Sequence, residues 1–191
     1  DVAVSPRTIS DGTNQWPMVM RAPSFWEAEA SHVAPDGRLV KSPLPLTAEP
    51  MDVIGGRMIA LLHADWNGMK AGSLVAYEIA PLLAGKAASV ETVFAPSASQ
   101  AIEEVRAAKG TLWVKLLDNV AGKLLALTRG TRGWSATPMP LPANSVVSLL
   151  TTGGADDAAY VSVEGLAQPG TLLAVTPAGA TTPIAALPAF F

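Results

Sequence analysis

The 191-residue chain is 49% apolar and 15% charged, a composition typical of globular rather than disordered proteins. Its formal net charge is −3 and its 13 Lys and Arg residues are scattered, which argues against a nucleic-acid-binding surface. Cysteine is absent, and this excludes disulfides, thiolate metal sites and cysteine nucleophiles.

No apolar run approaches the roughly 18 residues that a membrane-spanning helix needs, so we expect no membrane segment. The sequence begins at Asp1, without an initiator methionine and without the basic start and apolar core of a signal peptide. We therefore expect this chain to be a piece of a longer protein, either cytoplasmic or periplasmic.

Short apolar runs separated by Gly, Pro, Asp and Asn predict β-strands along the first half of the chain. A turn is predicted at residues 35–37, Pro-Asp-Gly, because Pro presets φ and Gly takes a positive φ without steric cost. The predicted strands cover residues 2–5, 17–22, 27–33, 38–46, 51–54, 58–62, 73–79 and 90–96.

The second half continues in the same style. Its predicted strands cover residues 101–106, 111–117, 123–128, 134–142, 145–150, 159–163, 171–175 and 182–191. Residues 98–109, rich in Ala, Glu and Lys, offer a helical alternative to the first of these strands. The repeat described next favours the strand, and a short helical piece stays open there and at residues 80–84.

One hairpin design recurs three times, at residues 57–80, 111–127 and 159–175. In each copy an apolar strand meets a corner that contains Gly, and in the first copy this corner holds Asp65, Asn67 and Gly68. The return strand then starts with Gly-Ser-Leu, Gly-Lys-Leu or Gly-Thr-Leu. Three copies in register indicate a repeat architecture.

The repeat divides the chain into four units of roughly 45 to 51 residues: 1–47, 48–98, 99–143 and 144–191. Each unit holds four strands, and its fourth strand is rich in Pro, which cannot donate to a strand ladder and so belongs at a sheet edge. We therefore predict an all-β fold, a β-propeller fragment of about four blades with four antiparallel strands each.

Side chains that could carry chemistry are few, and most favour a structural role. His32 and His63 lie in different units, and neither has a partner at the spacing of a metal site. Among the carboxylate pairs, Glu27 and Glu29 share one strand face and favour a solvated outer surface over a two-carboxylate site. The other pairs are Glu103 with Glu104, and Asp156 with Asp157, which follows two glycines and predicts a turn.

No catalytic or cofactor motif is present. The glycine pairs Gly55-Gly56 and Gly153-Gly154 do not extend into a phosphate-binding loop, and no Gly-x-Ser-x-Gly nucleophile elbow occurs. Trp66, Trp113 and Trp134 favour core or inter-blade packing over a binding platform. We therefore predict no catalytic, cofactor-binding or metal-binding residue in this chain.

Four stretches nevertheless carry a resemblance to a known family. Ala64-Asp-Trp followed by Ala71-Gly-Ser-Leu-Val-Ala, then Leu117-Asp-Asn-Val, Gly133-Trp and the final Leu187-Pro-Ala-Phe-Phe resemble the propeller of the prolyl oligopeptidase family of serine peptidases. No single stretch is diagnostic, but their order and spacing are specific. The resemblance covers nearly the whole chain and is strongest from about residue 33.

This resemblance implies a function. In the family a seven-bladed propeller caps an α/β-hydrolase domain that holds a Ser-Asp-His triad. These enzymes cleave short peptides, typically after proline, and the propeller limits access to small or unfolded substrates. The chain would be the second half of that propeller, without the hydrolase domain and without any family catalytic residue, and inactive alone. Its implied partners are that hydrolase domain and peptide substrates.

The alternative function is that of a free-standing propeller that binds a protein or glycan. A third interpretation, catalysis by the propeller itself, has no supporting group of residues.

Four blades alone would leave two blade faces bare. If each exposes about 600 Å² of apolar area, about 15 kcal/mol of gross burial per face is forgone at roughly 25 cal/mol per Å². Patches of this size are rarely left open on a monomer. We therefore expect the isolated chain either to self-associate, with two copies completing a ring, or to contract into a four-bladed ring.

Overall fold

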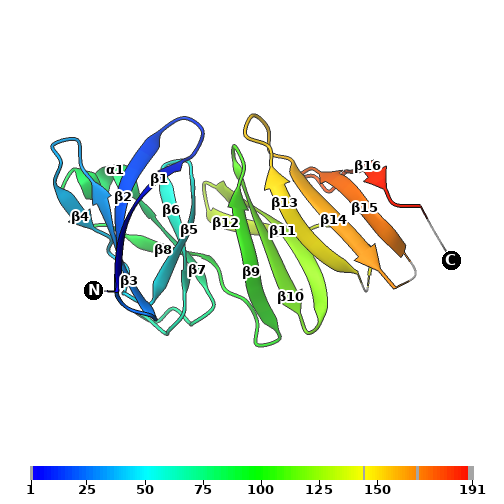
Figure 1. Cartoon of the computed structure of the whole chain (residues 1–191), viewed down its shortest axis with the longest axis horizontal. Helices are drawn as coiled ribbons and strands as arrows, with labels where there is room; N and C mark the ends of the chain where they lie inside the picture. Colours follow the sequence, from blue (N-terminus) through cyan, green and yellow to red (C-terminus); the bar gives the residue numbers. More distant parts are fainter. Residues whose placement is uncertain (1, 144, 167, 189–191) are drawn as a thin grey trace. The chain divides into compact units, whose positions relative to one another are not determined.

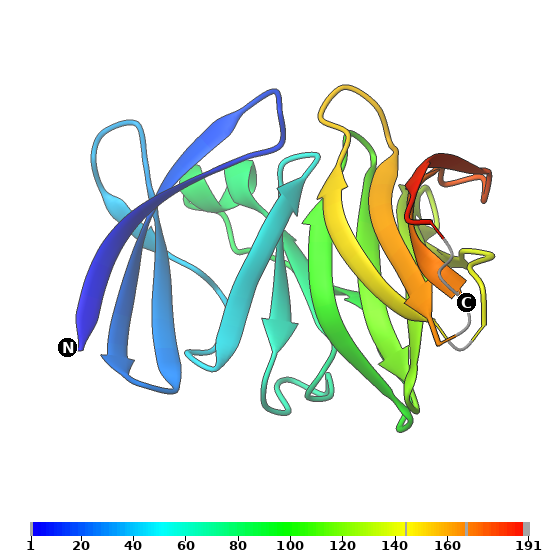
Figure 2. The same cartoon turned by 45° about the vertical axis from the view of Figure 1, so that its right-hand side comes forward.

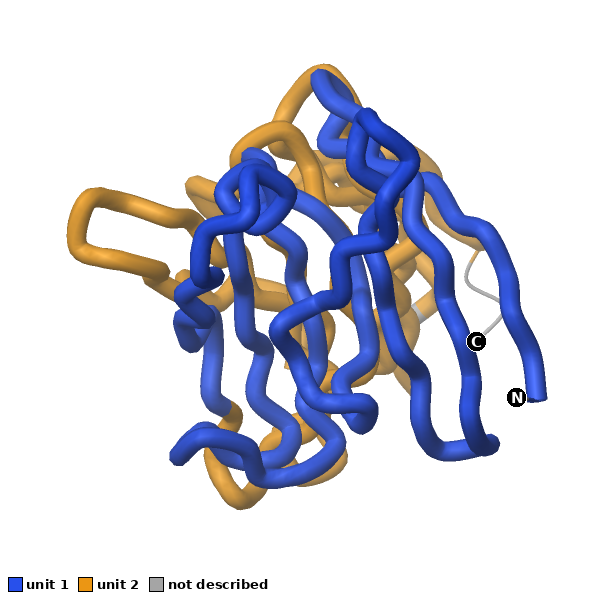
Figure 3. Tube along the Cα trace, turned by 90° about the vertical axis from the view of Figure 1, so that its left-hand side faces the viewer, with its two compact units in different colours: residues 1–95 blue, residues 96–191 orange. Residues whose placement is uncertain are grey.

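The chain folds into four four-stranded antiparallel sheets, each formed by four strands consecutive in the sequence (Figure 1). The computed structural model describes residues 2–143, 145–166 and 168–188. Two compact units make up the chain, residues 1–95 and 96–191 (Figure 3), and each contains two of the sheets. No helix among the described residues is long and apolar enough to cross a membrane.

The first unit contains eight strands and one short helix. Its first sheet consists of β1 (Ala3–Ser10), β2 (Gln15–Ser24), β3 (Glu27–Val33) and β4 (Leu39–Lys41). Its second sheet consists of β5 (Ala48–Ile54), β6 (Arg57–Leu62), β7 (Leu74–Glu78) and β8 (Val90–Phe94), with α1 (Ile79–Leu83) between β7 and β8.

The second unit repeats the pattern without a helix among its described residues. Its first sheet consists of β9 (Gln100–Ala107), β10 (Thr111–Asp118), β11 (Ala121–Gly130) and β12 (Gly133–Pro138). Its second sheet consists of β13 (Val146–Thr152), β14 (Ala159–Gly165), β15 (Gln168–Val175) and β16 (Thr181–Ala186). The predicted unit boundary at residue 144, and residues 189–191 of the predicted family run, lie outside the described residues.

The all-β prediction is confirmed, and the helical alternative over residues 98–109 is wrong. Those residues form β9, which pairs with β10, so ladder hydrogen bonds override the helix propensity of Ala and Glu. The short helical piece left open near residues 80–84 is present as α1. Strand β1 runs to Ser10 through Pro6, further than predicted, because an edge strand tolerates a residue without an N–H.

The corner of the first repeated hairpin has the predicted turn chemistry. Asn67 and Gly68 both have positive φ, 45° and 80°, in a tight turn that the backbone of Trp66 and Met69 closes with two hydrogen bonds. Asp65 fixes the rest of the loop, since it accepts hydrogen bonds from Lys70 Nζ at 2.6 Å and Ala71 N at 2.9 Å. The hydrogen bond from Lys70 lowers the pKa of the Asp65 carboxyl.

In each unit two sheets lie side by side (Figure 2). Apolar side chains of both sheets are buried between them. The core of the first unit combines Met18 of the first sheet with Met58 and Tyr77 of the second sheet and with Ile79 of α1, all essentially inaccessible. The corresponding core of the second unit includes Trp113, Leu124, Val147, Val161, Val163 and Val175. Alternating strand residues therefore supply the cores, as a period of two requires.

A hydrogen bond between corners ties the two sheets of each unit together. In the first unit Gly56 N donates to Asp11 Oδ2 at 3.0 Å. In the second unit Gly110 N donates to Asp157 Oδ1 at 2.6 Å. All four residues lie in turns between the first and second strands of their sheets. Partial burial acts to raise the pKa of Asp11, but hydrogen bonds from the backbone N–H groups of Asn14, Thr13 and Gly56 lower it.

A histidine and a tyrosine share the core of the first unit. His32 on β3 is fully buried, and its Nε2 lies 2.7 Å from the hydroxyl oxygen of Tyr77 on β7. Nδ1 of the same ring has no hydrogen-bond partner among the described residues. Burial lowers the pKa of His32 to about 4 and raises the pKa of Tyr77 to about 12, so both side chains stay neutral near pH 7.

The buried histidine predicts acid sensitivity. The unfolded chain takes up a proton near pH 6.5 and the folded chain only near pH 4, so the free energy of unfolding should fall as the pH drops through this window. The loss is at most about 3 kcal/mol, at about 1.4 kcal/mol per pH unit. Urea unfolding at several pH values should show this slope in the native sequence and a shallower one in His32→Gln; parallel slopes would contradict the assignment.

The corner hydrogen bond of the second unit predicts a specific stability loss. Asp157→Ala removes the acceptor of Gly110 N and should lower the free energy of unfolding by about 1–2 kcal/mol. Asp157→Asn keeps an acceptor oxygen at this position and should recover at least half of the loss. Chemical denaturation of the three proteins measures both effects, and equal stability of all three would show that the contact contributes nothing.

Candidate functional site

The carboxylate pairs do not form an acid–base site. Glu29 forms ion pairs with Lys41 Nζ at 2.6 Å and with Arg21 Nη1 at 3.9 Å. The hydrogen bond from Lys41 lowers the pKa of the Glu29 carboxyl. Glu27, two residues earlier on β3, accepts a hydrogen bond from Ser24 Oγ at 3.1 Å instead. The two carboxylates have separate partners, so nothing holds a shared proton between them.

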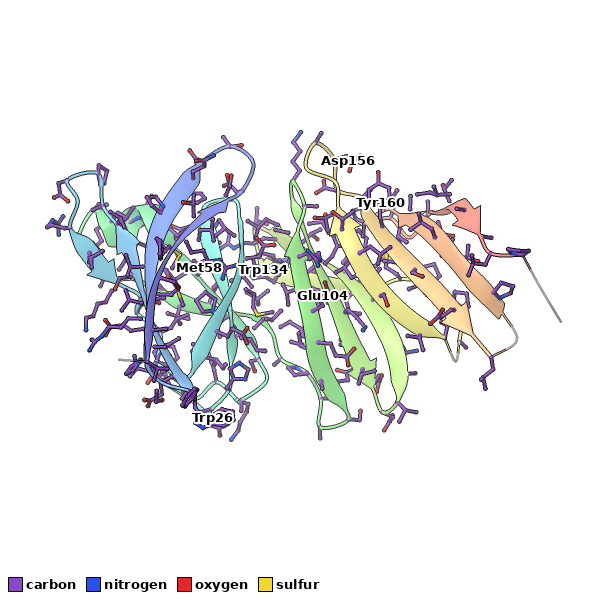
Figure 4. All side chains as sticks on the ribbon, in the orientation of Figure 1. Trp26, Met58, Glu104, Trp134, Asp156 and Tyr160 are labelled. Atoms are coloured by element: carbon purple, nitrogen blue, oxygen red, sulfur yellow. The ribbon has the colours of Figure 1, made fainter. Side chains whose placement is uncertain are left out.

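The other two pairs have structural partners as well. Glu103 and Glu104 are consecutive on β9 and form separate ion pairs, with Lys115 at 2.9 Å and with Arg106 at 2.7 Å. Asp156 and Asp157 lie in the β13–β14 turn that was predicted (Figure 4), and there Asp157 accepts the corner hydrogen bond from Gly110. Each of these four carboxylates therefore has a partner of its own within the chain.

The histidines lie apart, as their spacing suggests. Strand β6 ends at Leu62, where the predicted strand ends, and the His63 side chain is 54% exposed. The reason is local: the chain leaves the ladder after Leu62, and Nε2 of His63 lies 2.9 Å from Glu49 Oε2. Within the described ranges no group of three or more His, Cys, Asp or Glu could hold a metal ion.

The tryptophans divide into packing residues and one exposed residue. Trp113 is fully buried and its Nε1 donates to the carbonyl of Asp157 at 3.0 Å, which confirms its predicted role in packing between sheets. Trp66 and Trp134 are half-buried. Trp26, by contrast, is 89% exposed at the tip of the β2–β3 hairpin (Figure 4), next to Phe25, which is 86% exposed.

The aromatic pair was missed by the sequence interpretation. Phe25 and Trp26 occupy the two-residue turn between β2 and β3, a position where polar or Gly residues are usual. Ser24 and Glu27 frame this turn: Trp26 N donates to Ser24 Oγ at 3.3 Å, and Ser24 Oγ donates to Glu27. Two aromatic residues in a corner between strands were the available signal.

Exposed apolar side chains recur at the same topological position in other sheets. Val120 in the β10–β11 turn and Leu166 after β14 are almost fully exposed, as Phe25 and Trp26 are. The corners between first and second strands hold polar residues and glycines instead, at residues 11–14, 55–56, 109–110 and 153–157. The second–third corner of the second sheet is polar, with Asp65, Asn67 and Lys70 exposed, and we call the corresponding ends of the other three sheets the apolar ends.

A cleft of about 710 Å³ opens at the apolar end of the first unit, between its two sheets. We call it the Trp26 cleft. Its first-sheet wall includes Arg7 of β1, Met20 of β2 and the Phe25–Trp26 turn. Its second-sheet wall includes Glu49 of β5, with His63 beside it. The cleft exists because the core side chains Met18, Met58 and Tyr77 fill the interface nearer the opposite corner, whereas small residues such as Ala22 and Ala48 line this end.

Comparison with known proteins identifies the family. The family model described as prolyl oligopeptidase, N-terminal β-propeller domain, matches residues 61–186. The chain belongs to this family. A curated relative, the uncharacterized peptidase y4nA of Sinorhizobium fredii, is 32% identical over 164 residues, which span 82% of this chain and 23% of that relative.

Solved structures agree on the fold of this prolyl oligopeptidase propeller chain. A post-proline cleaving enzyme from Rickettsia typhi matches with a TM-score of 0.83 at 22% identity, over 98% of this chain and 29% of that one. Oligopeptidase B from Trypanosoma brucei matches with a TM-score of 0.67 at 11% identity, over 97% of this chain and 27% of that one. The four sheets are therefore propeller blades, and the chain spans about a quarter of the length of these proteins.

Proposed function

We propose that this chain is a non-catalytic, substrate-gating part of a serine endopeptidase of the prolyl oligopeptidase type. The α/β-hydrolase domain of the same protein would supply the Ser-Asp-His triad, and the substrates would be short peptides, cleaved after proline. The family match over residues 61–186 supports the propeller part of this proposal. The similarity to the post-proline cleaving enzyme from Rickettsia typhi motivates the substrate class.

The apolar ends of the blades carry the proposal. In a four-stranded antiparallel blade the chain enters the first strand and leaves the fourth at the end that also carries the second–third turn. A domain that continues from a blade is therefore attached at this end. Phe25, Trp26, Val120 and Leu166 are exposed there, and exposed apolar side chains at such a place favour burial by another domain.

Gating follows from the same arrangement. Blades stacked beside a hydrolase domain restrict the approach of a substrate to routes between or through the blades, and a folded protein is too large for either. The sequence contains no Gly-x-Ser-x-Gly elbow, so the proposal assigns the nucleophile to the hydrolase domain. The propeller would thus act on rate by selecting substrates, not by chemistry.

Active-site labelling with a fluorophosphonate tests this function. The product of the uninterrupted native reading frame should react with the label, and short proline-containing peptides should compete with that reaction. A folded protein that contains the same proline-containing sequences should not compete. This 191-residue chain should stay unlabelled in the same experiment. Failure of both products to label would remove the peptidase assignment and leave a free-standing propeller that binds a protein or glycan as the better account.

The isolated chain should also associate with itself. The first sheet of unit one exposes Val2 and Val4, and the last sheet of unit two exposes Val146, Leu150 and Ile184, although strand residues of this kind favour burial. Sedimentation velocity over a concentration series should show a dimer, or a compact monomer if the four blades contract into a ring. An extended monomer that persists at high concentration would contradict this expectation.

A further inference from the structure

We propose that the Trp26 cleft binds a cationic side chain, Lys or Arg, of a peptide. The inference rests on the proposed function in one respect only, which is that it takes peptides as the ligand class. The site itself is defined by residues of the first unit alone. It lies at the apolar end, where a peptide on its way to a hydrolase domain would pass.

The charges in the cleft favour a cation. Two carboxylates, Glu27 and Glu49, and one guanidinium, Arg7, line the same cavity. Within the described part of the chain Arg7 forms no ion pair with either carboxylate, so the opposite charges do not neutralise each other. Two negative groups against one positive group leave an excess of negative charge, which attracts an ammonium or guanidinium group.

Each carboxylate keeps hydrogen-bonding capacity for a ligand. Glu27 receives one hydrogen bond, from Ser24 Oγ to Oε2. Glu49 lies against His63 through Oε2 at 2.9 Å. Among the described residues neither Oε1 has a partner, so each carboxylate can accept a further charge-assisted hydrogen bond. A Lys or Arg side chain offers several donors and can satisfy both.

The aromatic pair adds a second attraction for a cation. Phe25 and Trp26 line the mouth of the cleft and are almost free of contact with the rest of the chain. The face of an aromatic ring, of Trp above all, attracts a cation through its quadrupole. Rings and carboxylates in one cleft are therefore complementary to the same group, and they are poorly suited to an anionic ligand.

The remaining walls suit a peptide backbone with apolar neighbours. Met20, Ala22, Ala48 and Pro50 provide an apolar floor, and the volume of about 710 Å³ lies within the range of small-ligand sites. The guanidinium of Arg7 can donate to peptide carbonyl groups. A segment of a few residues fits these features better than a nucleic acid, whose phosphates the two carboxylates would repel.

Three blocked pentapeptides that differ only at the central residue test the inference. The central residue is Lys, its uncharged isostere norleucine, or Glu, and binding to the 191-residue chain is measured by isothermal titration calorimetry. We expect the Lys peptide to bind about fivefold or more tighter than the norleucine peptide, since one ion pair and one cation–π contact each contribute modestly at an exposed site. The Glu peptide should bind most weakly.

Variants then place the binding in the cleft. Glu49→Gln should abolish most of the Lys preference, and Trp26→Ala should weaken the Lys peptide about threefold or more. Two matched controls in the other unit should bind like the native chain. Glu104→Gln breaks an ion pair on β9, and Val120→Ala shortens an exposed turn residue. Circular dichroism of each variant checks that the sheets are intact.

Two results would overturn the inference: equal affinity for the Lys and norleucine peptides, or a Lys preference that survives both cleft variants. If the cleft instead receives a loop of the hydrolase domain, Trp26→Ala should lower the thermal stability of the longer protein, and the 191-residue chain should show no preference among the peptides. That outcome also overturns the inference. Fluorophosphonate labelling tests the proposed function separately. Labelling without a Lys preference would keep the peptidase and remove the cation site, and a Lys preference without labelling would do the reverse.

Discussion

Burial of sheet faces against neighbouring sheets is the constraint on which the rest of this structure depends. A four-stranded antiparallel sheet has two faces, and here the faces that meet within a unit are filled by Met18, Met58 and Tyr77 or by Trp113 and Val161. A repeat of this kind cannot bury such a face alone, so each sheet is stable only as part of a stack. Chemistry that needs solvent is thereby confined to the ends and edges of the sheets.

The two ends of a blade are used differently. At the corners between first and second strands, Asp11 and Asp157 accept backbone hydrogen bonds from the neighbouring sheet, and these contacts hold the sheets in register. At the apolar ends comparable contacts between corners are replaced by exposed side chains such as Trp26 and Leu166. One end therefore serves the stack itself, and the other presents surface to something outside the sheets.

The strands and turns could be predicted because their signals are local. Alternating apolar residues and corners such as Asn67-Gly68 specify a hairpin within about twenty residues of sequence, and three copies specify a repeat. The partners of side chains could not be predicted in this way. His32 meets Tyr77 across 45 residues, and Glu49 meets His63 only because β6 ends one residue before the histidine. At β9 the composition alone favours a helix, and it is the repeat pattern that predicts the strand, which pairs with β10.

The exposed Trp26 illustrates the limit most clearly, because its residue type favours burial while its position in a two-residue turn excludes it. A stack with no functional role at its ends would gain solubility from a polar residue at this turn. Retaining two aromatic rings beside the carboxylates Glu27 and Glu49 makes sense only if the turn contacts a partner or ligand. Under the proposed function, peptide selection would reside here, in the groups that the blades leave exposed.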